Sequence, residues 1–376
     1  MTSAIYLLWL AASPWSPANA ELVRARDAQD QPALQRIASQ ASARADKEAG
    51  DAAAQYWAAL AESTLAEVAM ETRDKNLSRA AAEAGLKTAE RATTLKPDIA
   101  EYHRIYGTLC GQAAAAVGGG IIGPGPLSVV LGTSGVVLAA TDRFLADPEG
   151  RVHAFCHAAP NRWFVMGVML AAAGSLAWFH DTLLPGVAYD AMLAEAESVP
   201  PGCDGLVFLP YLAGERTPHF DPQARGAFFG LTLGHDRGAL TRAVLEGVAF
   251  ALRDCLDTVR ATGAVAERGR VSGGGSRSRL WLRTVASALE VPIEIMATDQ
   301  GSAFGAALLG GVAAGVYRDA EQAAAACVRV TAVVDPVPAW IEPYREARSR
   351  FRDGYPALRS ITSRPAGSPE PPSGAR

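Results

Sequence analysis

The sequence predicts an α/β domain with a mixed sheet, preceded by an all-α helical segment. From residue 113 onward, short β-branched apolar runs alternate with helix-like segments, the pattern of α/β domains. Residues 21–109 instead carry apolar side chains at three- and four-residue steps, which indicates amphipathic helices. With 49% hydrophobic and 20% charged residues among 376, the chain has enough apolar residues for a substantial core and two domains.

The amino terminus has part of the pattern of an export signal. Ile5 to Ala12 is a short apolar run, and Ala18-Asn19-Ala20 resembles a small-x-small cleavage site. The run is too short to span a bilayer. No Lys or Arg precedes it and prolines interrupt it, so a cleaved signal peptide over residues 1–20 and a start without one stay as alternatives.

Residues 21–111 are predicted to be helical. Trp57, Leu65 and Val68 belong to one periodic apolar stripe, and Lys96-Pro97-Asp98 ends a second helix. Helix, turn and helix followed by Lys-Pro-Asp resemble a tetratricopeptide-type pair, which implies a surface for a protein partner. Because a stable solenoid needs about three repeats and one is visible, an ordinary helical bundle stays an equal alternative.

Residues 112–345 are predicted to form the α/β domain. Its first strands, 127–131 and 136–140, flank the turn Gly132-Thr133-Ser134-Gly135 as a β-hairpin. The later elements are a helix at 164–178, a strand at 206–209, a helix at 240–258, a strand ending at 270–272, a helix at 278–289, a strand at 291–296 and a helix at 303–314. Residues 346–376 are predicted to be a tail, disordered from Ser363 because of its Pro, Ser and Gly content.

Two glycine turns carry the functional signal. One is Gly132, Thr133 and Ser134, and the other is Gly273-Gly274-Gly275-Ser276. Bare backbone that a ligand can approach, several N–H donors and neighbouring hydroxyls suit a nucleotide. Alone, the first turn is better explained as a plain hairpin turn, and the alternative explanation of the glycine triplet is a close helix–strand contact. As a pair they predict that both face one cleft from opposite sides, roughly 10 Å apart, so that a nucleotide can reach both.

The segment between the turns is more specific. It contains Glu215-Arg216-Thr217-Pro218-His219, then Gly226-x-Phe228-x-Gly230-Leu231, then Leu240-x-x-Ala243-Val244-Leu245-Glu246. Over about residues 112–345 the sequence closely resembles the carboxy-terminal half of the FGGY carbohydrate kinases, and the xylulose kinases in particular. Ala239 departs from the second signature, which has a polar or acidic side chain there.

The resemblance implies a ribonuclease-H-like, actin-type ATPase fold. It implies transfer of a phosphoryl group from ATP, with Mg²⁺ bound to the nucleotide, to a ketose such as D-xylulose. Gly132, Thr133 and Ser134 would contact the β- and γ-phosphates, and Gly273-Gly274-Gly275 with Ser276 would approach the adenosine. A kinase of this kind implies a cytoplasmic location, whereas a signal peptide would imply export.

The resemblance also raises a doubt about activity. In the resembled family a catalytic aspartate lies in a Gly-Gly-Asp turn just before a small-residue run. Here that run is Gln112 to Gly118, and Gly111 stands in place of the aspartate. The amino-terminal half of such kinases, which carries the sugar site, is not found in the sequence, and residues 21–109 are too short and too helical to take its place. We therefore expect no catalytic residue at this turn and no sugar turnover, with Glu215 as the first alternative base if turnover occurs.

The helical segment joins the kinase-like half at the catalytic turn without a linker, which indicates a rearranged or truncated gene product. The alternative to a kinase is therefore a non-enzymatic chimera, with a nucleotide-binding half-fold and a helical partner-binding segment. Gly301, Gly305, Ala306 and Ala307 form a small-residue run that we interpret as helix packing.

Charge and cysteine content exclude some other functions. The net charge is −4 and no basic stripe is present, so nucleic acid is not expected as a partner. The five cysteines are scattered and odd in number, and they show neither zinc spacing nor a disulfide framework. That usage favours a reduced compartment, and no protein metal site is expected.

Overall fold

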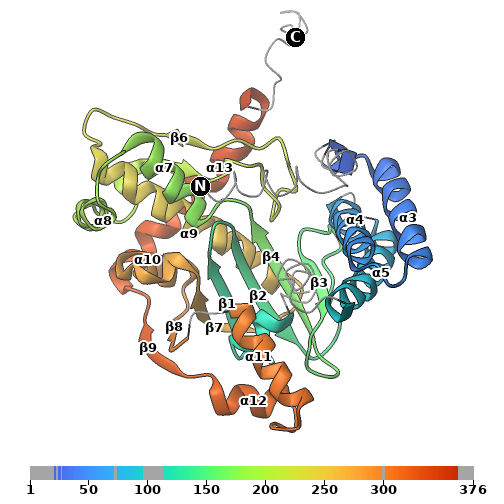
Figure 1. Cartoon of the computed structure of the whole chain (residues 1–376). Coiled ribbons are helices and arrows are strands. Elements are labelled where there is room, and N and C mark those ends of the chain that lie inside the picture. Colours follow the sequence, from blue (N-terminus) through green and yellow to red (C-terminus); the bar gives the residue numbers. More distant parts are fainter. Residues whose placement is uncertain are drawn as a thin grey trace, which may run out of the picture. The chain divides into compact units, whose positions relative to one another are not determined.

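The computed structural model describes residues 21–22, 24–26, 28–71, 74–95, 113–298 and 301–362 (Figure 1). The chain divides into two compact units, Met1–Gln112 and Ala113–Arg376. The candidate signal peptide, Gly111 and the tail from residue 363 lie outside the described residues. Within the described part, none of the helices combines the length and the apolar character that crossing a bilayer requires.

The smaller unit consists of helices. These are α3 (Gln31–Lys47), α4 (Ala52–Glu71) and α5 (Lys75–Leu95). The Gln55 side chain donates to the Ala45 carbonyl at 2.6 Å, and the Ser42 hydroxyl donates to Glu62 at 2.8 Å. Because positions rise along α4 as they fall along α3, the two helices are antiparallel. The described residues of this unit contain no strand, and its relation to tetratricopeptide repeats stays a prediction.

The sheet of the larger unit has seven strands in the order β3-β4-β2-β1-β7-β8-β9. β1 pairs in parallel with β7, and β7 with β8, whereas the other neighbours are antiparallel. A separate two-stranded sheet pairs β5 with β6. The strands are β1 (Gly125–Leu131), β2 (Gly135–Thr141), β3 (His153–Cys156), β4 (Trp163–Met169), β5 (Val207–Leu209), β6 (Ala227–Phe229), β7 (Ala266–Ser272), β8 (Ile293–Met296) and β9 (Val330–Val334).

Helices cover both faces of this sheet, so every residue of β2 is buried. Val137 of β2 belongs to the core shared with α9, whereas Val136 and Leu138 pack with Ala116 of the short helix at 113–118. Figure 1 shows α11 and α12 at the end of the unit opposite α13. The helices are α7 (Ala173–Leu183), α8 (Tyr189–Glu197), η1 (Cys203–Gly205), α9 (Arg237–Ala261), η2 (Gly274–Arg277), α10 (Arg279–Leu289), α11 (Gly301–Ala313), α12 (Ala320–Cys327) and α13 (Pro338–Thr362).

The mixed α/β sheet and most element predictions are confirmed, but the helix predicted at 164–178 is wrong. Its first part is the strand β4, and the helix α7 begins only at Ala173. β4 is buried from Phe164 to Met169, so no polar position marks the two-residue period of a strand. A continuous apolar run of this kind has no periodicity that separates a strand from a helix.

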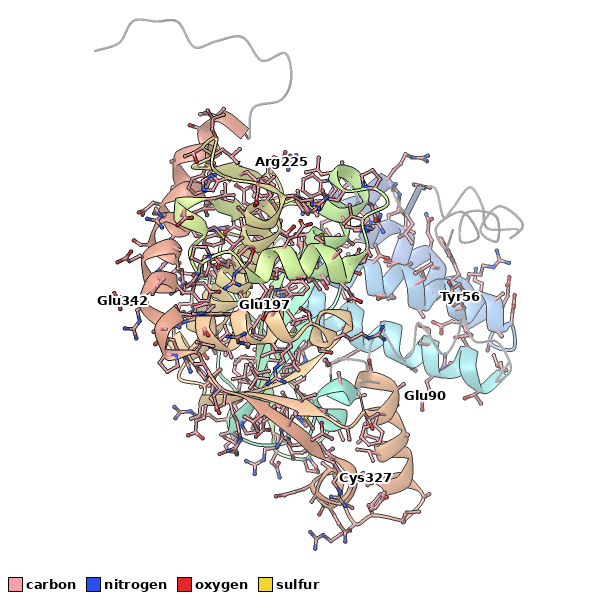
Figure 2. All side chains as sticks on the ribbon, turned by 90° about the vertical axis from the view of Figure 1, so that its left-hand side faces the viewer. Tyr56, Glu90, Glu197, Arg225, Cys327 and Glu342 are labelled. Carbon is pink, nitrogen blue, oxygen red and sulfur yellow. The ribbon has the colours of Figure 1, made fainter. Side chains whose placement is uncertain are left out.

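The carboxy-terminal boundary at residue 345 also needs correction. α13 continues to Thr362, and Ala347, Phe351 and Tyr355 belong to the main core. Figure 2 shows Glu342 on this helix and Cys327 at the end of α12, on different parts of the unit. The sequence did not predict this helix because its interior contains two prolines and many arginines, which are not typical of a core segment.

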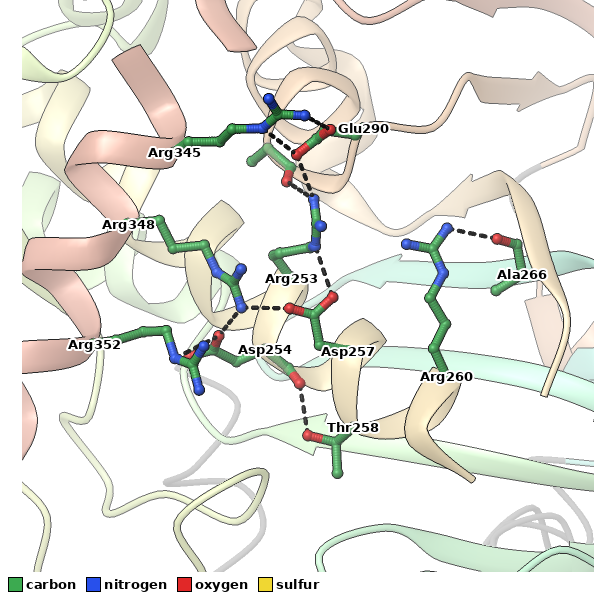
Figure 3. Close-up of polar contacts among 11 residues, drawn as sticks. Arg253, Asp254, Asp257, Thr258, Arg260, Ala266, Glu290, Arg345, Arg348 and Arg352 are labelled. Carbon is green, nitrogen blue, oxygen red and sulfur yellow. Dashed lines mark hydrogen bonds and ion pairs between the residues drawn. The ribbon is translucent and has the colours of Figure 1, made fainter. Parts of the chain in front are cut away.

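Arginines join α13 to α9 (Figure 3). Arg348 pairs with Asp254 and, at 2.6 Å, with Asp257. Arg345 pairs with Glu290 at 2.6 Å, and Glu290 also accepts from Arg253 of α9 at 3.1 Å. The Asp254 side chain is 5% exposed, so these contacts neutralise a buried charge.

Candidate functional site

The first glycine turn closes the hairpin between β1 and β2, as predicted. Leu131 pairs with Gly135, so Gly132, Thr133 and Ser134 form the whole turn. Thr133 is exposed and its two neighbours are half-buried. The turn is therefore accessible to a ligand at the end of a central strand.

The start of α7 binds the carbonyl groups of this turn. Thr133 O accepts from the N–H groups of Ala172 at 2.8 Å and Gly174 at 3.1 Å, and Gly132 O accepts from Ala173 at 2.8 Å. A Cβ at Gly174 would lie 2.9 Å from Thr133 O, so this close approach requires a glycine. The first N–H groups of α7 are thereby used to hold the turn.

The donors of the turn remain available. Among the described residues, no backbone or side-chain acceptor is recorded for the N–H groups of Gly132, Thr133 and Ser134. Three backbone donors with two neighbouring hydroxyls form a neutral cradle of the kind that suits phosphate oxygens. The residues present therefore fit the phosphates of a nucleotide.

The second glycine turn follows β7. Gly273 has a φ of 91°, and a Cβ there would lie 2.7 Å from the Leu131 carbonyl group. A Cβ at Gly275 would lie 2.9 Å from Trp281 of α10, whereas Gly274 is exposed with nothing within 4 Å. Gly273 and Gly275 thus allow close packing, and Gly274 leaves bare backbone open to a ligand.

The two turns lie at the same edge of the sheet. β1 and β7 are parallel neighbours, and Val130 pairs with Ser272. The carboxyl ends of the two strands therefore lie side by side. Backbone contact between Gly273 and Leu131 follows from this register. The two turns therefore lie next to each other. The prediction that they face each other across a cleft is wrong.

Two positively charged residues at this edge were missed. Arg277 ends η2 and Arg279 begins α10, and both are exposed. The signal was present in the sequence as Ser276-Arg277-Ser278-Arg279, immediately after the glycine triplet. Guanidinium groups here add positive charge beside the neutral turns, which favours an anionic ligand.

In the small-residue run of α11, Gly305 packs closely, whereas Gly301 has open space around it. A Cβ at Gly305 would lie 1.7 Å from the Ala114 carbonyl oxygen, so this glycine sets the contact with the helix at 113–118. Ala306 and Ala307 are exposed, and the packing interpretation is wrong for them.

Glu215 does not have the position of a catalytic base. It is 2% exposed, and its Oε1 accepts from the N–H groups of Leu170 at 3.1 Å and Arg216 at 2.7 Å. Burial raises the pKa of this carboxyl to about 8. A group enclosed in this way does not reach a substrate hydroxyl. Gly111, which we predict at the position of the family's aspartate, lies outside the described residues.

Other polar groups lie outside this edge. A cavity of about 510 Å³ is lined by residues of α9, α10 and α13, including Arg253, Arg345, Arg348 and Arg352, and by no residue of either glycine turn. In the part of the chain that the structure describes, no three His, Cys, Asp or Glu side chains gather as metal ligands.

Both turns lie within a segment that matches one known protein family. Residues 127–314 match the profile of the FGGY family of carbohydrate kinases, C-terminal domain. The chain belongs to the FGGY family of carbohydrate kinases. Its match includes both glycine turns and Glu215.

The chain is similar to xylulose kinases over about its last two thirds. It is 40% identical over 271 residues to the xylulose kinase of Escherichia coli K12, covering 70% of this chain and 55% of that protein. It is 31% identical over 268 residues to the xylulose kinase of Bacillus subtilis 168, covering 71% and 54%. The chain thus spans about half the length of the curated relatives it matches.

A solved structure supports the fold. A crystal structure described as a xyloylose kinase from Brucella ovis superposes with a TM-score of 0.61 at 43% identity, covering 66% of this chain and 51% of that one. The larger unit therefore has the actin-type ATPase fold of the FGGY sugar kinases.

Proposed function

We propose that residues 113–362 bind ATP, with Mg²⁺ carried by the nucleotide, at the edge formed by Gly132–Ser134 and Gly273–Ser276. The observation that carries this proposal is the contact between the two turns, which puts unbonded N–H donors beside exposed glycine backbone. ATP supplies the phosphoryl group in kinase chemistry, and Mg²⁺ neutralises part of its charge. The turn holds phosphate oxygens, and Arg277 and Arg279 attract the anion.

Titration calorimetry with Mg²⁺–ATP tests this binding. A Gly274→Glu substitution should abolish it, because a negatively charged side chain would occupy the open backbone. The same variant should fold normally, since nothing lies within 4 Å of that position. Gly310→Glu is the matched control, because Gly310 of α11 is also open and belongs to neither turn. Unchanged affinity in Gly274→Glu would refute the proposed site.

We further propose that residues 113–362 derive from kinases whose substrate is a ketose such as D-xylulose. We also propose that this chain does not phosphorylate that sugar. The similarity to xylulose kinases supports the first point. Gly111 in place of the family's aspartate supports the second. So do α3, α4 and α5, because the described residues before 113 are helical and contain no sheet that could form a second kinase lobe.

The assay is sugar-dependent ADP release with D-xylulose, for the wild type and for Gly111→Asp. Loss of a general base costs about 10²- to 10⁴-fold in rate, and loss of substrate positioning costs several kcal/mol more. Neither protein should exceed its sugar-free control, because the described residues before 113 are helical and give an added aspartate no second kinase lobe to face. Sugar-dependent turnover by the wild type would refute the proposed inactivity.

The alternative is a non-enzymatic chimera in which the helical unit binds a protein partner. The separate core of α3 and α4, with Leu34, Trp57 and Leu65 buried, favours a unit that folds on its own. ATP binding without turnover on any ketose would favour this alternative over an active kinase.

A further inference from the structure

The candidate phosphate turn depends on the corner between β4 and α7. β4 ends at Met169, and residues 170–172 turn the chain into α7. The N–H groups of Ala172, Ala173 and Gly174 hold the carbonyl groups of Gly132 and Thr133. A shift of this corner would therefore shift the turn.

One side chain anchors the corner itself. The Leu170 N–H donates to Glu215 Oε1 at 3.1 Å, and the Arg216 N–H donates to the same oxygen at 2.7 Å. Glu215 is distant from Leu170 in sequence. It can lie beside the end of β4 because β3 pairs with β4 only as far as Met166. Beyond that point, Thr217 donates its N–H to Val168 O at 2.9 Å. The segment 215–217 thus continues the pairing that β3 leaves.

Glu215 is enclosed rather than exposed to a ligand. Its Oε2 is buried and has no hydrogen-bond partner among the described residues. Asp254 and Cys255 of α9, Tyr211 and the adjacent Arg216 are the titratable or charged groups that interact with it. Burial is the largest cause of its raised pKa, Arg216 lowers the pKa and Asp254 raises it. The side chain therefore presents a neutral carboxyl at neutral pH, with Oε1 as acceptor.

We propose that Glu215 is a positioning residue of the nucleotide site: it fixes the corner at 170–172, and through it the turn of Gly132, Thr133 and Ser134. The inference rests on the proposed function, because it assigns Glu215 a role in nucleotide binding. Glu215 contacts no substrate in this role. It acts through two successive sets of hydrogen bonds, from its carboxyl to Leu170 and from Ala172, Ala173 and Gly174 to the turn.

Three variants separate positioning from general stability. Glu215→Gln keeps the Oε1 acceptor without the ionisable group, so its Mg²⁺–ATP dissociation constant should stay within about threefold of the wild type. Glu215→Leu has similar size but no acceptor, so the dissociation constant should rise at least about tenfold. Thr217→Val is the matched control, because it removes bonds to Val168 N–H and Arg151 O that lie before the corner. It should lower the melting temperature and leave the dissociation constant within about twofold.

Amide hydrogen exchange of the full chain without nucleotide gives a second readout. Glu215→Leu should speed exchange of the Leu170, Ala172, Ala173 and Gly174 amides, which donate to Glu215 or to the turn carbonyls, at least about tenfold. Glu215→Gln and Thr217→Val should leave these amides unchanged. If the wild type binds no nucleotide, the proposed function fails, whereas this exchange pattern still tests the coupling of corner and turn. Unchanged exchange in Glu215→Leu, or equal loss of affinity in Thr217→Val, would overturn the inference.

Discussion

Gly273 lies against Leu131 so closely that a Cβ on the glycine would be 2.7 Å from the Leu131 carbonyl oxygen. The contact joins the carboxyl ends of β7 and β1, which are far apart in sequence. It also brings Gly274 next to the hairpin turn. The two glycine turns thus form one continuous edge of bare backbone, which explains why a single glycine triplet is weak evidence of a nucleotide site and the pair is stronger.

The first prediction concerns this contact. Gly273→Ala should destabilise the protein by about 1–3 kcal/mol, because the position combines a φ of 91° with a backbone clash. Gly274→Ala is the control for stability, since nothing lies within 4 Å of that residue, and it should change stability by less than about 0.5 kcal/mol. Urea unfolding measures both. Equal stability of the two variants would contradict the close contact.

The second prediction uses two glycines of α11. Gly305→Ala should cost about 3 kcal/mol or more, because its Cβ would lie 1.7 Å from the Ala114 carbonyl oxygen and the helices would have to separate. Gly310→Ala, on the same helix with nothing within 4 Å, should gain up to about 1 kcal/mol from helix propensity. Thermal unfolding of both variants checks the opposite signs. A neutral Gly305→Ala would show that this helix contact is looser.

The third prediction concerns pH. The pKa of Glu215 is about 8 in the folded chain and about 4.3 when unfolded, so between these values the folded state binds the extra proton. Stability therefore falls as pH rises through this window. Glu215→Gln removes that contribution, so relative to the wild type it should gain stability from pH 5 to pH 8, by up to about 5 kcal/mol. Urea unfolding at four pH values measures the difference, and parallel pH profiles would count against a protonated Glu215.

The fourth prediction concerns the arginines of Figure 3. Arg348→Met should destabilise the protein by about 3–5 kcal/mol, because it deprives the buried Asp254 of its main partner. Arg350→Met is the matched control on the same helix, because Arg350 is exposed and forms no ion pair with described residues. It should change stability by less than about 0.5 kcal/mol. Similar melting temperatures for both variants would show that α13 does not depend on these pairs.

The sequence predicted elements well where a local signal existed. The hairpin at Gly132–Ser134 and the helix after Gly275 were predictable because turn residues flank apolar runs. β4 was not, because its buried residues carry no period, and α13 was not, because its core residues lie among arginines. Glu215 was predicted as a reserve base because its sequence context gives no information on burial. Its role depends on which strand ends beside β4, and that is settled only by the three-dimensional pairing.

The position of β1 has a consequence for how the chain is made. β1 is a central strand, yet its partner on one side, β7, is synthesised only after β2, β3, β4 and the long helix α9. Until then the nascent chain carries an unpaired edge bearing Leu127, Val129 and Leu131, which are fully buried at the end. Such late, non-local pairing slows folding and leaves a strand edge open to association with other chains. If the ribosome pauses, or chaperones are scarce, before residue 272 has left the ribosome, the chain should therefore aggregate more.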